Sequence, residues 1–482
     1  MNIKEKYEAV IGLEVHAQLL TQTKAYSNDE NIYGAAPNTK TSAITLGHPG
    51  TLPVSNKKVI EYAVKLGLSV GAKIRKHNEY ARKNYFYADL PKGYQITQDT
   101  TPICNGGVIE ILDEKNKTKK INITRIHMEE DAGKSIHDLD PFNTLIDLNR
   151  AGVPLLEIVS EPEIKTGDEA FNYVMEVRKL VRYLDICDGN MEEGSLRCDA
   201  NISVRIRGES KFGTKVEVKN MNSSRNVKNA IDFEIKRQIE VIENGGQIVH
   251  ETRGFDAVKG ITISQRHKEE ANDYRYFPEP DLQPIEITKE YIEQIKKTLP
   301  LLPKELNTIY QREYKLSQYD SNLLIEDKET ALFFNEICAL TNNYKLAANI
   351  INGVIKSYLN ENGLTIPQLD ISAKNIANLI DLIEGNQISN TIATSKIFPL
   401  LISSKKSPKK IAEENNWIQE SDNTILKDLI LQALEKYPEK IQEYKNGKKG
   451  LIGLFMGEVM KISKGKADPK ITNKLLRDIL EK

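Results

Sequence analysis

A carboxylate and an imidazole lie two residues apart in the segment 10–19, VIGLEVHAQL. Apolar residues at every second position predict a β-strand with one face in a core, so Glu14 and His16 share the opposite face. At roughly 3.3 Å of rise per residue, their backbone positions are about 7 Å apart. Oxygen and nitrogen ligands of this kind can bind a divalent cation, although a solvent-exposed strand face would have the same pattern.

A further carboxylate interrupts an apolar run. The segment 155–160, LLEIVS, is apolar except for Glu157 and Ser160, which is typical of a strand that is covered on both faces. An ionised carboxylate in such a strand is costly unless a cation or a hydrogen-bond donor meets it.

Three acidic residues follow one another in the tract 127–134, HMEEDAGK, namely Glu129, Glu130 and Asp131. Charges this close repel one another, so either water or a metal ion must screen them. Together with Glu14, His16 and Glu157 they form a set of hard ligands that is suited to Mg²⁺ and not to structural zinc. Because Mg²⁺ keeps positions for water and phosphate, such a set favours nucleotide chemistry.

The length and the cysteines limit the class of protein. A chain of 482 residues is expected to form two or three domains. Its four cysteines form no C-x-x-C pair, which predicts a reduced, cytoplasmic setting without disulfides or a cysteine zinc site. No run approaches the roughly 18 apolar residues of a membrane span, and the N-terminal segment does not resemble a signal or transit peptide.

Charge is distributed unevenly along the chain. The net charge is −1, but residues 405–482 contain 17 basic and 12 acidic side chains, which gives +5 and leaves −6 for the rest. A basic C-terminal module on an acidic body suits a tRNA-sized polyanion, and it equally suits an ordinary charged helical surface.

The part of the chain up to about residue 290 predicts an α+β fold with a largely antiparallel sheet. Strict alternation over 195–206 predicts a long half-covered strand, and 215–219 predicts a second strand that pairs with it. A capping box at 166–169 predicts the start of one helix, and another runs from near Ser224 to the glycines at 245–246.

After about Pro303 the pattern favours helices, over 323–360 and 373–401 and again after a linker at 403–410. We therefore predict three domains. They are an α+β domain at 1–292, a helical domain at 293–405 and a small helical tail domain at 406–482.

Several motifs are more specific than these patterns. The chain resembles the B subunits of the tRNA-dependent amidotransferases of the GatCAB type over nearly its full length. The segments that carry the resemblance are VIGLEVHAQL, ARKNYFYADLPKGYQITQ (81–98), HMEEDAGK, DLNRAGVPLLEIVSEPEI (147–164), MEEGSLRCDANISVR (191–205), DYRYFPEPDL (273–282) and GLFMGEVMKISKGKADP.

The resemblance implies a cradle-like catalytic domain and a defined reaction. Such a protein uses ATP and Mg²⁺ to phosphorylate the side-chain carboxylate of Glu-tRNA(Gln) and/or Asp-tRNA(Asn). Ammonia from the glutaminase (the A chain of the complex) then displaces the phosphate, and a small C chain completes the heterotrimer. Phosphoryl transfer needs positioning and charge neutralisation but no protein nucleophile, so none is expected on this chain.

The resemblance also implies roles for individual residues. The metal ligands would be His16, Glu129 and Glu157. The neighbouring catalytic carboxylates Glu14 and Glu130 would bind the ion through water. Charge and strand face, and not the resemblance, nominate Asp199 as a further catalytic residue that orients the substrate together with Asn201. Charge and strand face nominate Arg82, Lys83, Arg150, Arg197 and Lys215 for the phosphates, although a salt bridge to Asp131 or Asp147 would equally explain Arg150. The predicted tRNA contacts are Lys448, Lys449, Lys464 and Lys466, each of which could equally belong to a solvated charge cluster.

The sequence departs from part of the family at one loop. Some relatives carry two cysteine pairs near positions 25–27 and 41–45, where this chain has AYS and TSAIT. We therefore expect no zinc and predict that packing around Tyr26, Tyr33 and Pro37 holds the loop. No G-x-x-x-x-G-K-[ST] motif occurs, so ATP must be held in another way.

Two other functions fit the same residues. A non-catalytic tRNA-binding scaffold would use the acidic cluster as a structural metal site. A free-standing ligase that joins ammonia to a small carboxylate would not need the basic tail at 405–482. The buried setting expected for Glu157 argues against a scaffold, because perturbed charges cluster at functional sites.

Overall fold

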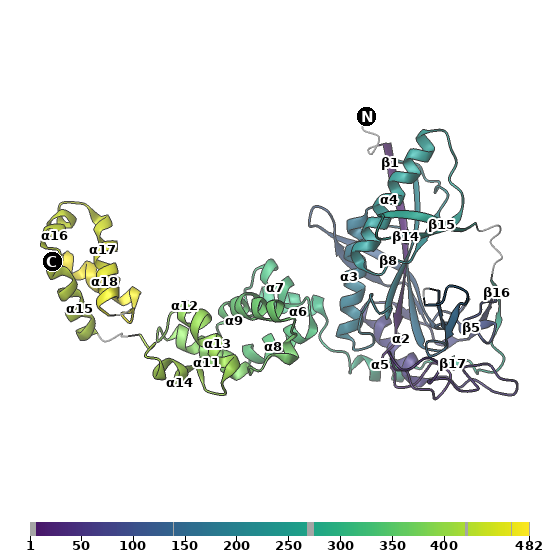
Figure 1. Cartoon of the computed structure of the whole chain (residues 1–482), viewed down its shortest axis with the longest axis horizontal. Coiled ribbons are helices and arrows are strands. Elements are labelled where there is room, and N and C mark those ends of the chain that lie inside the picture. Colours follow the sequence, from purple (N-terminus) through teal and green to yellow (C-terminus); the bar gives the residue numbers. More distant parts are fainter. Residues whose placement is uncertain (1–5, 138, 268–273, 420–422, 464, 482) are drawn as a thin grey trace. The chain divides into compact units, whose positions relative to one another are not determined.

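The computed structural model of the protein describes residues 6–137, 139–267, 274–419, 423–463 and 465–481. The chain divides into two compact units, Met1–Leu302 and Pro303–Lys482. The first unit contains all the strands among the described residues, and the described elements of the second unit are all helices (Figure 1). The predicted fold class is therefore confirmed, whereas the predicted limits at 292 and 405 stay predictions.

A ten-stranded sheet forms the centre of the first unit. Its strand order is β15-β14-β13-β12-β1-β11-β8-β6-β2, with β7 paired to β8. The strands are β1 (Tyr7–Gln18), β2 (Lys73–Ile74), β6 (Cys104–Asn105), β7 (Val108–Leu112), β8 (Thr118–Glu130), β11 (Pro154–Ser160), β12 (Leu196–Ile206), β13 (Val216–Lys219), β14 (Glu251–Asp256) and β15 (Ile261–His267). Neighbouring strands are antiparallel except for β13 and β14, which are parallel.

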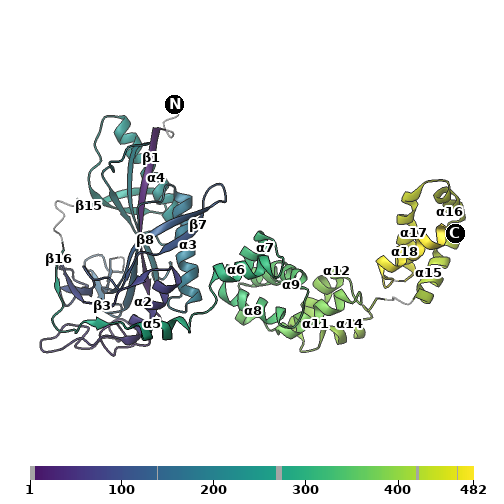
Figure 2. The same ribbon diagram turned by 180° about the vertical axis from the view of Figure 1, so that it is seen from behind.

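One face of this sheet packs into a hydrophobic core. The odd-numbered residues of β1 from Ala9 to Ala17 lie in that core together with apolar side chains of α2 (Lys57–Ser69), α3 (Gly167–Tyr183) and α4 (Ser224–Glu243). Helices α3 and α4 lie side by side and cover part of the sheet (Figure 2). The even-numbered residues of β1 therefore point to the other face, as the alternation predicts.

The two predicted helix starts are confirmed. The Thr166 hydroxyl accepts a hydrogen bond from the Glu169 amide at the start of α3, and the Ser223 hydroxyl accepts one from the Asn226 amide at the start of α4. Such caps satisfy amides that have no partner within the helix. After α4, Gly245 adopts a φ of 75°, which a residue with a side chain rarely reaches.

Smaller sheets lie beside the large one. A three-stranded sheet joins β16 (Arg275–Pro278), β4 (Ala81–Asn84) and β5 (Tyr94–Thr97), so that residues near 276 lie next to residues near 83. The other pairs are β9 (Lys134–Ile136) with β10 (Leu145–Asp147) and β3 (His77–Asn78) with β17 (Ile285–Glu286). Helix α5 (Lys289–Lys296) follows β17 and packs against α2.

The second unit is built from short helices. They are α6 (Pro303–Arg312), α7 (Gln318–Leu324), α8 (Lys328–Cys338), α9 (Tyr344–Ile350), η1 (Ile351–Ile355), α10 (Lys356–Asn362), η2 (Ile366–Gln368), α11 (Ala373–Glu384), α12 (Asn390–Ile392), η3 (Ala393–Ile397), α13 (Phe398–Ser403), α14 (Pro408–Glu414), α15 (Asn423–Glu435), α16 (Pro438–Lys445), η4 (Lys449–Leu451), α17 (Ile452–Ile462) and α18 (Pro469–Leu480). Among the described helices of the whole chain, none is both long and apolar enough to cross a membrane.

The end of the predicted linker is helical in the structure. Pro408 starts α14, Ser407 caps it, and α14 packs against α11 and α13. A separate hydrophobic core joins α15, α17 and α18, with Leu426, Phe455 and Leu476 fully buried in it.

Candidate active site

Four polar side chains form a row across adjacent strands of the large sheet. His16 on β1 lies opposite Arg197 on β12 and opposite Glu157 on β11, and Glu157 lies opposite His127 on β8. Directly opposite residues of antiparallel strands share one face, with Cβ atoms about 4.5–5.5 Å apart. Strand register therefore brings together residues from four distant parts of the sequence, on the face away from the helical core.

A second row lies beside the first. Glu14 on β1 is opposite Asp199 on β12, and Asn201 donates a hydrogen bond to the Glu14 carboxylate at 2.8 Å. Lys219 on β13 donates to Asp199 at 2.8 Å and forms an ion pair with Glu217 at 3.1 Å. This part of the polar face thus alternates carboxylates with amide and ammonium groups.

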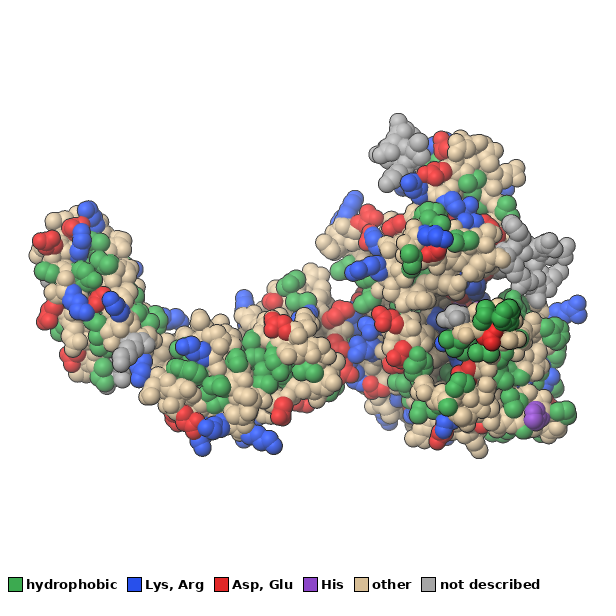
Figure 3. Space-filling view, in the orientation of Figure 1, with side chains coloured by type: hydrophobic (Ala, Val, Ile, Leu, Met, Phe, Trp, Pro, Cys, Tyr) green, Lys and Arg blue, Asp and Glu red, His purple; other side chains and the backbone are tan. Residues whose placement is uncertain are grey.

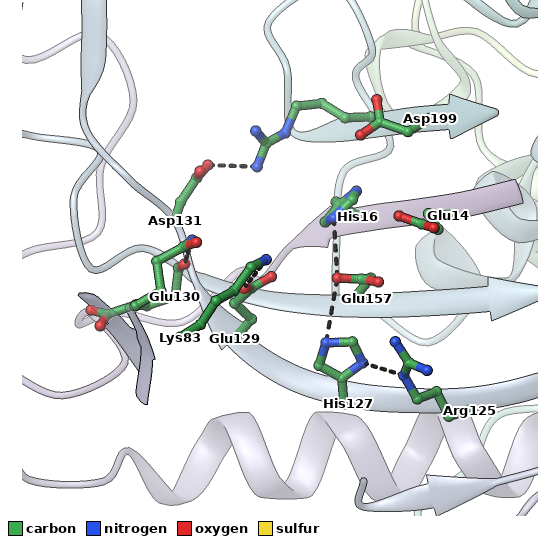
Figure 4. Close-up of polar contacts among 12 residues, drawn as sticks. Glu14, His16, Lys83, Arg125, His127, Glu129, Glu130, Asp131, Glu157 and Asp199 are labelled. Carbon is green, nitrogen blue, oxygen red and sulfur yellow. Dashed lines mark hydrogen bonds and ion pairs between the residues drawn. The ribbon is translucent and has the colours of Figure 1, made fainter. Parts of the chain in front are cut away.

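The ligand atoms of His16, Glu129 and Glu157 lie within 4.8 Å of one another. Glu157 Oε2 is 3.3 Å from the Nε2 atoms of both His16 and His127, so that the carboxylate lies between two imidazoles (Figure 4). Opposite ligands of an octahedral Mg²⁺ are about 4.2 Å apart, given bonds of about 2.1 Å. Small side-chain movements would therefore let these three residues hold one divalent ion and leave positions open for water or substrate.

The second histidine of the row is oriented by an arginine. Arg125 Nε donates to His127 Nδ1 at 3.4 Å. With Nδ1 as the acceptor, the proton of a neutral His127 is on Nε2, where it can be donated to Glu157. Arg125 and His127 therefore hold the Glu157 carboxylate from the side opposite His16.

The pKa values of two glutamates of the site, Glu157 and Glu14, are shifted in opposite directions. Burial alone would raise the pKa of the Glu157 carboxyl, but His127 and His16 beside it hold that pKa well below its usual value. Burial raises the pKa of Glu14, and the nearby charge of Glu157 raises it further. Neighbouring carboxyls with divergent pKa values are typical of functional sites.

A cleft of about 240 Å³ opens over this face. Its acidic residues face a group of cations, and its lining is almost entirely polar. The lining residues are Glu14, His16, Lys83, Thr97, Gln98, Asp99, Arg125, His127, Glu157, Asp199, Asn201, Lys215, Glu217, Lys219, Tyr274 and Tyr276. An acidic floor with cations around it can hold a metal ion together with the anionic groups that the ion binds.

The structure brings many of the predicted site residues to this cleft. Glu14, His16, Lys83, Glu157, Asp199 and Lys215 line it, and Glu129 joins it through an ion pair of 3.2 Å with Lys83. Burial lowers the pKa of the Lys83 ammonium, but Glu129, Tyr276 and Glu157 together raise it above its usual value, so this side chain stays charged.

The remaining predicted residues of the first unit are held by other partners. Arg82 donates two hydrogen bonds to Glu279, at 2.7 and 2.9 Å. Arg150 donates to the carbonyls of Ala132 and Gly133. Their role in phosphate binding stays a prediction, and neither of the two guanidinium groups lines the cleft.

Asp131 and Glu130 have partners just outside the cleft. Arg197 donates a hydrogen bond to Asp131 at 2.7 Å, and Arg150 lies 3.7 Å from the same oxygen. A salt bridge to Asp131 was one of the two alternative roles that the sequence left open for Arg150. Glu130 forms an ion pair with Lys92 and accepts a hydrogen bond from the Ile96 amide at 2.8 Å. Glu130 therefore links the end of β8 to β5, and Asp131 links the residue after β8 to β12.

The predicted tRNA contacts lie in the second unit. Lys448 pairs with Glu443 at 3.0 Å, and the Lys449 ammonium lies 4.3 Å from the centre of the Tyr444 ring. Lys466 is half-buried, and Lys464 lies outside the described residues. Their binding to tRNA stays a prediction.

Several cleft residues were missed by sequence reasoning. They include Arg125, His127, Glu217 and Lys219. The signal for the first two was available, because Arg125, His127 and Glu129 alternate along one strand and must share its face.

The loop that follows β1 is held by hydrogen bonds, and the prediction of packing around Tyr33 and Pro37 was wrong. Both side chains are exposed, whereas Tyr26 is buried as predicted. The Asp29 carboxylate accepts hydrogen bonds from the hydroxyls of Ser27 and Ser42 at 3.0 Å, from the Ser42 amide and from the Thr45 hydroxyl. Hydroxyl groups and one carboxylate thus join the segments 25–29 and 41–45.

Comparison with known proteins agrees with the resemblance seen in the motifs. The family model described as the GatB/GatE catalytic domain matches residues 9–293, and the one described as the GatB domain matches residues 332–480. The B subunit of the aspartyl/glutamyl-tRNA(Asn/Gln) amidotransferase of Pelagibacter ubique is 48% identical over 98% of this chain and 97% of its own length. The corresponding protein of Thermodesulfovibrio yellowstonii is also 48% identical, over 99% of this chain and all of its own length. The chain therefore belongs to the family of B subunits of the tRNA-dependent amidotransferases, which are carbon–nitrogen ligases.

Proposed function

We propose that this chain carries the ATP- and Mg²⁺-dependent step in which the side-chain carboxylate of Glu-tRNA(Gln) and/or Asp-tRNA(Asn) is phosphorylated and then amidated. The observation that carries the proposal is the convergence of His16, Glu129 and Glu157 beneath a cleft that also contains cations. The names of the relatives supply the pair of substrates.

A carboxylate is a poor acyl donor, because the group that would leave is an oxide. ATP would supply a phosphoryl group to one carboxylate oxygen, which gives an acyl phosphate and ADP, and Mg²⁺ would neutralise charge on the transferred group. Ammonia then attacks the carbonyl carbon, inorganic phosphate leaves, and the side chain becomes an amide.

The residues of the cleft fit the demands of this reaction. His16, Glu129 and Glu157 form an N/O ligand set that leaves positions open, as Mg²⁺ in phosphoryl-transfer sites requires. The cations Lys83, Arg125, Lys215 and Lys219 line the cleft and can neutralise phosphate oxygens. Glu14 lies on the same face as the metal-ligand candidate His16, and a hydrogen bond from Asn201 holds its carboxylate there.

Ammonia is proposed to come from a glutaminase, the A chain, in a heterotrimer with a small C chain. All four cysteines of the chain are buried, and none of them lines the cleft. Burial raises the pKa of Cys187 to about 12, and it likewise raises the pKa of Cys104 and Cys338, which keeps these thiols unreactive near neutral pH. A glutaminase nucleophile on a partner chain is consistent with this. The lysines of α16–α18 and their connections are proposed to contact the tRNA body.

The test is amide formation and ATP cleavage on Glu-tRNA(Gln) with free ammonium, which bypasses the glutaminase. The wild-type heterotrimer is compared with Glu157→Gln and with Glu209→Gln, an exposed glutamate outside the cleft. Binding of Mn²⁺, followed by electron paramagnetic resonance, gives a second readout for the same three proteins.

We expect Glu157→Gln to lose both reactions and to bind Mn²⁺ more weakly, while tRNA binding is retained and Glu209→Gln behaves as wild type. Full activity of Glu157→Gln would refute the assignment of the metal site. That result would instead support the alternative, a tRNA-binding scaffold whose acidic cluster has no part in catalysis.

A further inference from the structure

Two tyrosines form one wall of the cleft. Strands β16 and β4 are antiparallel, with Tyr276 opposite Lys83, and Tyr274 lies just before β16 with its ring centre 5.1 Å from the Lys83 ammonium. Both rings line the cleft, yet Tyr274 is 45% exposed and Tyr276 is 42% exposed. This wall therefore places two partly exposed aromatic rings at the opening of the cleft.

The aromatic surface continues away from the cleft. The Tyr85 ring lies edge-on to Tyr274, with ring centres 5.5 Å apart, and edge-on to Tyr87, with ring centres 5.7 Å apart. Tyr87 is 57% exposed and Phe86 is 89% exposed. Figure 3 shows exposed hydrophobic side chains gathered where β5 and β16 lie in Figure 1. Contiguous exposed apolar surface of this kind marks binding sites in soluble proteins.

Cations accompany these rings. The Lys83 ammonium lies 5.1 Å from the centre of the Tyr274 ring, and Arg125 and Lys215 line the same cleft. Exposed aromatic faces next to Lys and Arg are the usual means of binding single-stranded nucleic acid, because every base has a face that can stack. The carboxylates of the floor repel phosphates, so a nucleic-acid strand would follow this wall and not the floor.

We propose that Phe86, Tyr87, Tyr85, Tyr274 and Tyr276 form a stacking wall for the unpaired 3′ end of tRNA, which leads the aminoacyl group into the cleft. This inference rests on the proposed function, in which an aminoacyl-tRNA is the substrate. The rings of Tyr274, Tyr85 and Tyr87 follow one another from the cleft outward, and Phe86, between the last two in the sequence, is exposed. A strand of successive bases can cover them, whereas the single adenine of ATP would cover only one.

The test uses the full heterotrimer and a tRNA(Gln) that carries 2-aminopurine in place of its 3′-terminal adenine. Stacking on a ring quenches the fluorescence of 2-aminopurine. The variants are Tyr274→Leu and Phe86→Leu, which remove a ring but keep an apolar side chain. The matched controls are Tyr274→Phe, which keeps the ring, and Phe212→Leu, since Phe212 is an exposed ring beside Arg205 that does not line the cleft.

We expect wild type, Tyr274→Phe and Phe212→Leu to quench the fluorescence, and Tyr274→Leu to lose the quenching. The Leu variants at 274 and 86 should bind the tRNA about tenfold more weakly, since stacking on one ring contributes this much or more. A tRNA without its unpaired 3′ nucleotides should bind to all five proteins alike.

Wild-type quenching and affinity in both Leu variants would overturn the inference. So would equal affinity of the wild type for the complete and the shortened tRNA. Recovery of the fluorescence on addition of ATP would assign the wall to the adenine of ATP instead. The proposed function is tested separately. It is refuted by full activity of Glu157→Gln, and that outcome does not depend on any of these binding measurements.

Discussion

The Glu279→Gln substitution tests how the aromatic wall is held in place. Glu279 follows β16 directly, and its side chain is fully buried, with both carboxylate oxygens bonded to Arg82 on β4. Its amide donates to the Tyr80 carbonyl at 2.9 Å. The pair therefore fastens the end of β16, which carries Tyr276, to the strand beside it.

The size of the effect follows from the two hydrogen bonds. A hydrogen bond to a charged group contributes about 1.5–3 kcal/mol, so two of them contribute about 3–6 kcal/mol before any compensation. Arg82 keeps an ion pair of 2.9 Å with Asp281, and the amide oxygen of the glutamine can still accept one of the two hydrogen bonds, so that part of this loss is recovered. We therefore expect Glu279→Gln to lower the free energy of opening β16 by about 3 kcal/mol, in line with the cost of breaking a buried ion pair.

The assay is hydrogen exchange of the segment 274–281, measured by mass spectrometry on the heterotrimer. A loss of about 3 kcal/mol corresponds to exchange that is roughly 150-fold faster at amides that exchange through this opening. The control is Asp281→Asn, because the Asp281 side chain is 36% exposed and its ion pair is expected to contribute less than about 1 kcal/mol. Unchanged protection of the segment in Glu279→Gln would refute the reasoning.

Three further substitutions test other parts of the first unit. Thr166→Ala removes the N-cap of α3 and should lower the free energy of unfolding by about 1 kcal/mol in thermal denaturation, whereas Thr166→Ser should not. Thr45→Val removes a hydrogen bond to Asp29 and should speed proteolysis of the loop 27–52 about tenfold, and equal cleavage of Thr45→Val and Thr45→Ser would contradict this. Burial lowers the pKa of Lys24 from 10.5 to about 8. The unfolded chain therefore binds more protons than the folded chain between these values, and stability should rise by about 3 kcal/mol from pH 8 to 10.5 relative to Lys24→Met. Denaturant unfolding at both pH values measures this difference, and parallel behaviour of the two proteins would exclude it.

Periodicity was enough to predict the faces of the central strands. Because side chains alternate along a strand, Glu14 and His16 had to lie opposite the core, and so did Asp199 on the long strand that pairs with β1. Thr166 caps α3 at the position that its capping box predicts. Ser223 caps α4, next to the predicted start near Ser224. These features depend on neighbours within a few residues.

Register and distant partners could not be predicted from the sequence. Alternation along β8 could have placed His127 on the polar face, but only the pairing of β8 with β11 shows that it lies opposite Glu157. The partner of Arg82 follows 197 positions later, at Glu279, and no local pattern links the two. A basic residue on a strand face can bind either a substrate phosphate or a carboxylate of the same protein. Which of the two it binds depends on the residues that the tertiary structure brings next to it.

The loop prediction failed for a different reason. Tyr33 and Pro37 are large apolar residues, but short polar side chains around Asp29 satisfy one another and hold the loop without them. Hydroxyl groups scattered through a loop carry little sequence signal, since they are equally common on solvated surfaces.

The position of β1 in the sheet has a consequence for synthesis of the protein. Both partners of β1, the strands β11 and β12, lie downstream, and β12 begins about 190 residues after β1. At about 5–20 residues per second, the ribosome needs roughly 10–40 s to make that stretch. During most of this interval, until β11 has been made, a strand destined for the centre of the sheet exposes its apolar face without a native neighbour, so the nascent chain is exposed to aggregation and to capture by chaperones.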